Sequence, residues 1–118
     1  MTRQRNILLI EDDARVRQAL GQALAVENYR VVPAANENEA LREFDSEEID
    51  IILLDLNPRH GSAWETVQRL TALRPHLRVV GMIARLEQHD SNLHHHAFDA
   101  LMEKPLDLLQ LIQTLNEF

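Results

Sequence analysis

Five short runs of apolar residues, separated by longer mixed stretches, place the strongest constraint on the fold of this chain. Two of them, residues 51–54 (IILL) and 79–83 (VVGMI), contain no charged or polar side chain. Successive side chains of a strand point to opposite faces of a sheet, so such strands need an apolar layer on both sides. The other three runs are residues 7–10, 31–32 and 100–102. The pattern predicts an α/β fold, with a five-stranded parallel sheet covered by helices on both faces.

The stretches between these runs carry apolar residues at the spacing of amphipathic helices. The predicted stripes are Val16, Ala19, Leu20, Ala23 and Leu24; Ala40, Leu41 and Phe44; Trp64, Val67, Leu70 and Leu73; and Leu108, Leu111, Ile112 and Leu115. Ser62 and Asp107 are the predicted N-caps of the last two stripes. Residues 86–97 have few apolar anchors, so we expect a mobile or distorted helical element there.

Composition narrows the class of protein. With 118 residues the chain is long enough for one core, and residues 1–118 are expected to form one domain. A formal net charge of −7 without a basic stripe disfavours direct binding of nucleic acid. The absence of cysteine excludes disulfides and cysteine-ligated zinc. The sequence has neither a signal-peptide core nor an apolar segment of membrane-spanning length, so we expect a cytoplasmic protein that does not enter a membrane.

Acidic residues follow two of the predicted strands. Glu11, Asp12 and Asp13 come directly after the first strand, and Asp55 comes directly after the third. In a doubly wound sheet, ligands bind at the carboxyl ends of the strands, so these side chains are candidates for one site. Two carboxylates about 4 Å apart repel by about 4 kcal/mol at an effective dielectric constant near 20. Such a cluster therefore needs a cation, a lysine or a raised pKa.

The residue types in this cluster indicate phosphate chemistry. Hard oxygen ligands favour Mg²⁺. Asp13 is expected to be a charge at the start of the first helix rather than a ligand. Lys104, after the fifth predicted strand, is a candidate counter-charge. An aspartate such as Asp55 can attack a phosphoryl group to give an acyl phosphate, with Mg²⁺ neutralising the phosphoryl oxygens and an ammonium group pairing with the product.

At these residues the chain resembles the receiver domains of two-component response regulators, and the resemblance covers essentially its whole length. The run ILLIEDD at residues 7–13 looks like the first strand of the family with its acidic pair, best matched by Glu11 and Asp12. Asp55 matches the phosphoacceptor at the end of the third strand, and Lys104 with Pro105 matches the lysine and the proline that follow the fifth strand. The run ANENEAL, at residues 35–41, is similar to the usual entry into the second helix.

The resemblance implies a doubly wound, flavodoxin-like and CheY-like three-layer sandwich with strand order 2-1-3-4-5. It implies that Asp55 takes a phosphoryl group from a sensor histidine kinase, assisted by Lys104. It also implies a Mg²⁺ site made by Glu11, Asp12, Asp55 and the backbone carbonyl of Asn57. In the family, the peptide bond before the proline is usually cis. Receivers are signalling domains with at most slow self-dephosphorylation, and DNA-binding transcription control is their commonest output.

Several positions differ from the pattern of the family, among them Ala97 and Phe98, where receivers usually have a Gly-Ala pair. Pro58 and Gly61 follow Asp55 by three and six residues, whereas receivers usually have these residues at four and eight, so the loop is two residues shorter. Ile83 stands where the family has a hydroxyl residue at the end of the fourth strand, and Leu101 stands at the aromatic switch position of the fifth. The usual relay from phosphate to surface therefore lacks both its hydroxyl and its aromatic ring.

Two functions follow from these observations. The first is a phosphoacceptor receiver that alters the surface it presents to an output domain or partner. The second is an atypical receiver that works without phosphorylation, as a dimerisation or interaction module using the face of residues 86–97, 100–102 and 108–115. A phosphatase with an aspartate nucleophile would need an acidic residue two positions after the nucleophile, where Asn57 stands.

Overall fold

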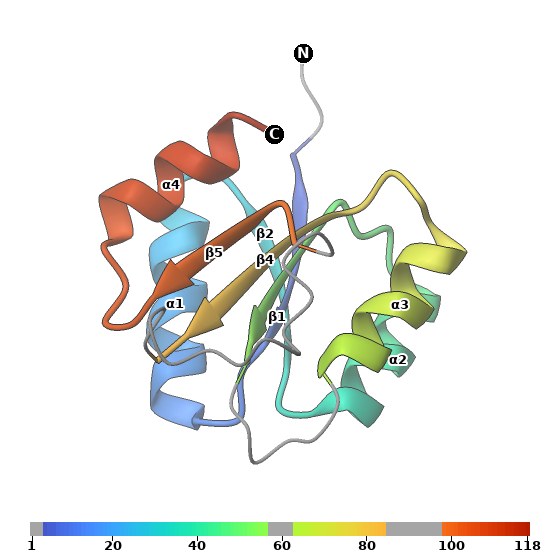
Figure 1. Ribbon diagram of the computed structural model, residues 1–118. Helices are drawn as coiled ribbons and strands as arrows, with labels where there is room; N and C mark the ends of the chain where they lie inside the picture. Colours follow the sequence, from blue (N-terminus) through green and yellow to red (C-terminus); the bar gives the residue numbers. More distant parts are fainter. Residues whose placement is uncertain (1–3, 57–62, 85–97) are drawn as a thin grey trace.

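The computed structural model describes residues 4–56, 63–84 and 98–118. Strands and helices alternate along most of this length (Figure 1). The elements are β1 (Asn6–Ile10), α1 (Ala14–Val26), β2 (Arg30–Ala34), α2 (Glu37–Ser46), β3 (Ile51–Asp55), α3 (Ala63–Leu73), β4 (Arg78–Ile83), β5 (Ala100–Glu103) and α4 (Leu108–Asn116). All five predicted strands are confirmed. The irregular helix predicted at residues 86–97 and the Ser62 cap lie outside the described residues.

The sheet has the order β2-β1-β3-β4-β5, and each neighbouring pair of strands is parallel. This confirms the predicted order. Helices α1 and α4 cover one face of the sheet, and α2 and α3 cover the other (Figure 1). The sheet is thus the middle layer of three.

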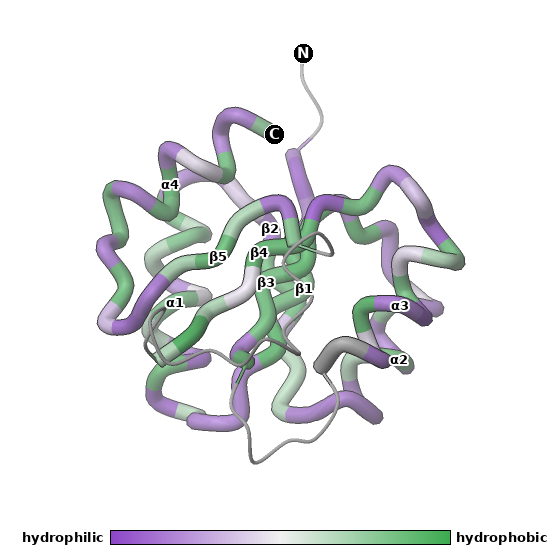
Figure 2. The backbone as a smooth tube through the Cα atoms, viewed as in Figure 1, coloured by the Kyte–Doolittle hydropathy of each residue, from purple (hydrophilic) through white to green (hydrophobic). Residues whose placement is uncertain are grey.

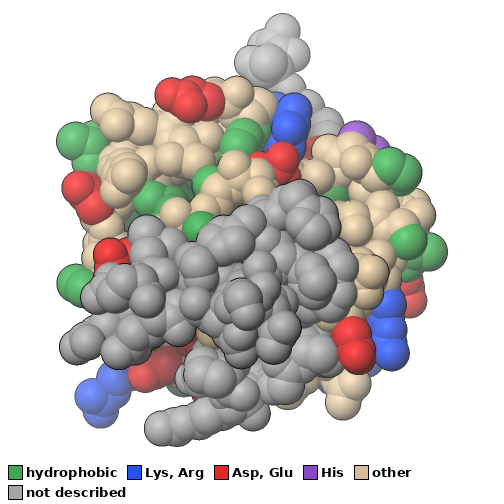
Figure 3. All heavy atoms as spheres, viewed as in Figure 1, with side chains coloured by type: hydrophobic (Ala, Val, Ile, Leu, Met, Phe, Trp, Pro, Cys, Tyr) green, Lys and Arg blue, Asp and Glu red, His purple; other side chains and the backbone are tan. Residues whose placement is uncertain are grey.

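Alternate residues of the central strands feed two separate cores. Leu8 and Ile52 belong to the cluster under α2 and α3, whereas Leu9 and Leu53 belong to the cluster under α1 and α4. Every residue of β1 and β3 is buried, as expected for central strands. Hydrophobic residues concentrate in the sheet while the helices show both characters (Figure 2), and hydrophobic side chains on the face in Figure 3 are scattered.

Caps begin three of the helices. Asp13 accepts hydrogen bonds from the backbone N–H groups of Arg15 and Val16, and Asp107 accepts one from Gln110, as predicted. Asn36 caps α2 in the same way. Such caps satisfy backbone donors that have no partner within the helix.

Four described residues of the predicted apolar stripes are exposed: Val16, Ala19, Leu73 and Leu108. Val16, Leu73 and Leu108 have exposed fractions of 38%, 65% and 43%. These three lie in the first or last turn of a helix, whereas Ala19 lies in the middle of α1. The spacing alone did not reveal which residues of each stripe face the sheet. Among the described residues, no helix is both long enough and apolar enough to span a membrane.

Gly81 of β4 and Gly21 of α1 give a test of this packing. A Cβ atom at Gly81 would lie 2.7 Å from Leu56 Cδ1 and 2.8 Å from Leu101 Cδ2, whereas at Gly21 it would meet only Val31 Cγ1, at 3.8 Å. We expect Gly81→Val to lower the free energy of unfolding by about 1–3 kcal/mol through overpacking. Gly21→Ala should raise it by about 0.5–1 kcal/mol, because alanine restricts the unfolded chain and suits a helix. Urea denaturation measures both, and a Gly81→Val variant as stable as the parent contradicts the packing described.

Candidate functional site

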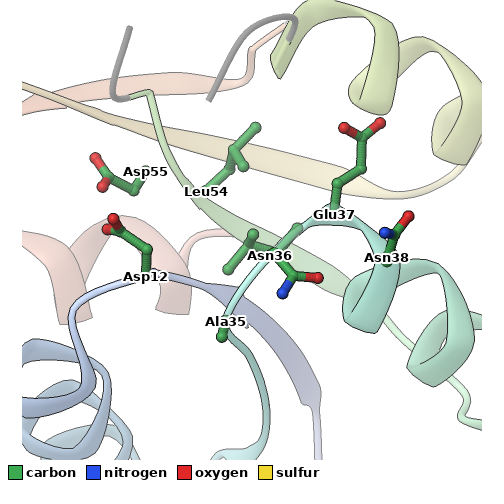
Figure 4. Close-up of a pocket in the computed structure, with 8 residues that line it drawn as sticks. Asp12, Ala35, Asn36, Glu37, Asn38, Leu54 and Asp55 are labelled. Atoms are coloured by element: carbon green, nitrogen blue, oxygen red, sulfur yellow. The ribbon is translucent and has the colours of Figure 1, made fainter. Parts of the chain in front are cut away.

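The carboxyl ends of β1 and β3 bring the acidic residues together. The two strands pair in parallel with Ile10 opposite Leu54, so Glu11 and Asp55 occupy equivalent places at the same edge of the sheet. The nearest carboxylate oxygens of Glu11, Asp12 and Asp55 all lie within 4.8 Å of one another. The side chains of Asp12 and Asp55 face each other in Figure 4. Glu11 and Asp55 are buried and Asp12 is exposed, so the cluster is open to solvent on the side of Asp12.

Lys104 supplies the counter-charge that the cluster needs. It follows β5, and its backbone N–H donates to Ile83 O of β4 at 2.8 Å. Its Nζ lies 2.8 Å from Asp55 Oδ1 and 3.6 Å from Glu11 Oε1. Burial alone lowers the pKa of Lys104, but the hydrogen bond and charge of Asp55, together with Glu11, outweigh burial and raise the pKa above 10.5. The peptide bond between Lys104 and Pro105 is cis, as the resemblance implied.

The pKa of Glu11 is raised even though Lys104 lies beside it. Burial is the main cause that raises the pKa of Glu11 from 4.5 to about 7, and the negative charge of Asp55 raises it further. The hydrogen bond from the backbone N–H of Asp13 and the positive charge of Lys104 lower the pKa, but by less. Glu11 Oε2 accepts a hydrogen bond from Asp13 N at 3.3 Å. Glu11 Oε1 is a buried side-chain oxygen without a hydrogen-bond partner, within the part of the chain that is described. An unsatisfied buried carboxylate oxygen is costly, and a cation would relieve it.

The residues fit a hard divalent cation. Three carboxylates and one ammonium group carry a net charge of −2 when all are ionised, and a divalent ion balances it. Their oxygen ligands are those that Mg²⁺ prefers. Glu11, Asp12 and Asp55 are the described residues that would hold the ion. Asn57, whose carbonyl is the predicted fourth ligand, lies outside the described residues.

A pocket of about 210 Å³ extends from the acidic cluster towards the start of α2 (Figure 4). Its lining includes Asp12 and Asp55 on one side and Asn36, Glu37 and Asn38 on the other. These three residues at the start of α2 were not predicted to be part of the site. The signal was available: β2 is the parallel neighbour of β1, so the loop after β2 opens at the same edge of the sheet.

Ile83 and Leu101, the two apolar residues that differ from the family pattern, both contribute to the packing of the interior. Ile83 is buried, with 8% of its surface exposed. Leu101 is half-buried and packs with Leu56 against the cluster under α2 and α3. Both leucines approach Gly81, which has no side chain to exclude them. Apolar side chains therefore occupy both positions, where the family pattern has one hydroxyl residue and one aromatic ring.

Comparison with known proteins assigns the fold and site to a class. Residues 7–116 match the response regulator receiver domain family. A CheY-like receiver domain protein from Methanospirillum hungatei has a similar structure, with a TM-score of 0.83 and 25% identity, covering 98% of this chain and 93% of that one. The response regulator TrrA of Thermotoga maritima, solved in complex with Mg²⁺ and BeF, gives a TM-score of 0.84 at 24% identity, covering 97% and 98%. The doubly wound sheet and its acidic edge are those of a two-component signalling domain. This chain belongs to the response regulator receiver domain family.

The curated relatives are longer proteins of two kinds. The transcriptional regulatory protein GlrR of Escherichia coli (strain K12) is 25% identical over 113 residues, which are 95% of this chain and 26% of GlrR. The sensor histidine kinase RcsC of Salmonella typhi is 30% identical over 110 residues, which are 92% of this chain and 12% of RcsC. The chain therefore spans about a quarter or less of the length of these two relatives.

The raised pKa of Glu11 predicts a pH-dependent stability in the presence of EDTA. Because the pKa is about 7 in the folded state and 4.5 in the unfolded state, the folded state binds the proton more tightly. The resulting stability is fully present below pH 4.5 and is lost as the pH rises through about 7. Between pH 6 and pH 8, the free energy of unfolding of the parent should fall by about 1 kcal/mol more than that of Glu11→Gln.

Exposed Glu103, at the end of β5, provides the control for this measurement. Glu103→Gln should keep the pH dependence of the parent in urea titrations at the two pH values. If Glu11→Gln keeps that dependence too, Glu11 is not the group responsible.

Proposed function

We propose that this chain is a phosphoacceptor receiver in which Asp55 takes a phosphoryl group from a phosphohistidine of a sensor histidine kinase. The observation that carries the proposal is the contact of Lys104 Nζ with Asp55 Oδ1 at 2.8 Å, inside a cluster of three carboxylates. A buried aspartate with an ammonium group beside it and acidic cation ligands around it has the groups that phosphoryl transfer to a carboxylate requires.

The transfer is one displacement at phosphorus. A carboxylate oxygen of Asp55 attacks the phosphorus atom, an O–P bond forms, and the P–N bond to the imidazole breaks. The electron pair of the P–N bond goes to the imidazole nitrogen, and the product is an acyl phosphate on Asp55. Lys104, already within hydrogen-bond distance of Asp55, pairs with a phosphoryl oxygen of this product.

Glu11, Asp12 and Asp55 hold Mg²⁺ in this proposal, with the Asn57 carbonyl as a further ligand. When bound, Mg²⁺ neutralises charge on the phosphoryl oxygens. The unsatisfied Oε1 of Glu11 and the net negative charge of the cluster support this assignment. TrrA, a protein of similar fold, was solved in complex with Mg²⁺ and BeF, which supports a divalent cation as the ligand of this site.

The wider setting is also part of the proposal. Residues 1–118 form one receiver domain in the cytoplasm, which signals by presenting an altered surface to an output domain or partner. It catalyses no reaction on other substrates and at most slowly removes its own phosphoryl group. The likeness to a sensor histidine kinase and to a transcriptional regulatory protein supports a kinase as donor and transcription control as output.

Asp55→Asn tests the acceptor directly. After incubation with Mg²⁺ and acetyl phosphate, the intact mass of the parent should increase by one phosphoryl group, because a carboxylate can attack phosphorus and a carboxamide cannot. Asp55→Asn should remain unmodified and bind Mg²⁺ more weakly. Asp45→Asn, at an exposed aspartate of α2, is the matched control and should be phosphorylated like the parent. A parent that binds Mg²⁺ but gains no mass contradicts the proposal.

A second candidate function is an interaction module that works without phosphorylation. Apolar Ile83 and Leu101, packed in the core where the usual relay is polar and aromatic, favour it. The interacting face would be formed by residues 86–97, β5 and α4. Of the described residues there, Leu109 at the start of α4 is 69% exposed and is a candidate contact.

The oligomeric state separates the two functions. As a phosphoacceptor receiver, the parent should change its sedimentation or its affinity for a partner only with Mg²⁺ and acetyl phosphate. As a module, it should be a dimer without them, and Leu109→Glu should dissociate it by burying a charge in the interface. Leu73→Glu, at a 65% exposed leucine of α3, is the control outside this face. Analytical ultracentrifugation measures each case, and a parent that stays monomeric throughout contradicts homodimerisation.

A further inference from the structure

The acidic loop between β1 and α1 is held from several directions. The backbone N–H of Glu11 donates to Ala34 O of β2 at 3.0 Å, which fixes the start of the loop to the sheet. Asp13 N donates to Glu11 Oε2 at 3.3 Å, and the Asp13 carboxylate caps α1. The donors in these contacts are backbone N–H groups of the loop and of the start of α1.

The side chain of Arg17 contacts carbonyl oxygens of the same loop. Its guanidinium Nη1 donates to Glu11 O at 2.8 Å and reaches Asp12 O at 3.4 Å. The backbone N–H of Arg17 also donates to Asp13 O at 2.8 Å, so the residue that contacts the loop is itself fixed in the first turn of the helix. One half-buried side chain of α1 thus contacts the backbone of both residues that carry the acidic pair.

We propose that Arg17 is a positioning residue for the cation site, and this inference rests on the proposed function. Two of the three candidate carboxylates extend from the backbone that Arg17 holds. Those carboxylates repel each other and Asp55, and repulsion favours loop conformations that separate them. By holding the carbonyl groups of Glu11 and Asp12, Arg17 keeps their side chains at the spacing that one ion can bridge. Groups that orient metal ligands in this way commonly change metal affinity by about 10–100-fold when they are removed.

Charge and positioning predict opposite effects for the loss of Arg17. A guanidinium group next to a cation site repels the cation, so its charge alone would weaken binding, and removal would tighten it. If Arg17 instead acts by ordering the loop, removal weakens binding. The sign of the change in Mg²⁺ affinity therefore distinguishes the two, and a neighbouring arginine on the same helix provides the charge control. Arg15 is exposed and, among the loop contacts above, contributes only its backbone N–H to the Asp13 cap.

The experiment is calorimetric titration of the full chain with MgCl₂, for the parent, Arg17→Ala and Arg15→Ala. We expect the dissociation constant to rise by about 10-fold or more in Arg17→Ala. In Arg15→Ala, it should stay equal or fall slightly, because that variant loses the same charge without losing a loop contact. Arg17→Met, which keeps most of the aliphatic stem but has no donor, should match Arg17→Ala and serves if the alanine variant does not fold.

Urea denaturation in EDTA, run on the same variants, separates positioning from general stability. If Arg17→Ala and Arg17→Met lose stability but their folded forms bind Mg²⁺ within twofold of the parent, Arg17 has only a structural role and the inference is wrong. Tighter binding in these variants also overturns it. A parent that binds no Mg²⁺ refutes the proposed cation site itself, which is a different result from equal binding by parent and variants.

Discussion

Burial of β1 and β3 on both faces is the constraint on which the rest of the structure depends. Their side chains alternate between two cores, so neither face of the sheet can be left to water. Helices must therefore cover both faces, and the parallel strands must be joined by crossovers that return the chain to the same end of the sheet. All carboxyl ends then open at one edge. The acidic cluster lies at this edge because Glu11, Asp12 and Asp55 end or follow these two strands.

Bringing three carboxylates to one edge costs free energy, and the protein relieves it in two ways. Lys104 contacts both Asp55 and Glu11, and its own pKa is raised in return. Glu11 remains buried with a pKa of about 7, so near neutral pH a proton occupies part of the population. A divalent cation would balance the negative charge that remains beside Lys104, and the Arg17 contacts would hold the loop in place before the ion binds. The same repulsion that destabilises the metal-free site thus prepares it for a cation.

Much of the fold followed from local patterns. The five apolar runs predicted the five strands, and Asp107 was predicted as a cap because its side chain acts on the backbone three residues away. The predictions were less accurate where a residue's environment depends on distant elements. Leu73 and Leu108 have the spacing of a core stripe but lie at helix ends and are exposed. Arg17 was missed as a site residue because its spacing on α1 gives no sign that its guanidinium turns back to the carbonyls of the preceding loop.

The sequence by itself determined which side chains stand at the ends of the strands. Glu11 and Asp12 follow β1, Asp55 ends β3, and Lys104 follows β5. These positions follow from strand length and residue order, which are properties of the chain. Only the tertiary structure decided that Lys104 Nζ reaches both Asp55 and Glu11, that the pocket continues to Asn36, and that Glu11 has a raised pKa. Distances between strands and the loss of water around a carboxylate arise when distant segments pack together, so no local pattern specifies them.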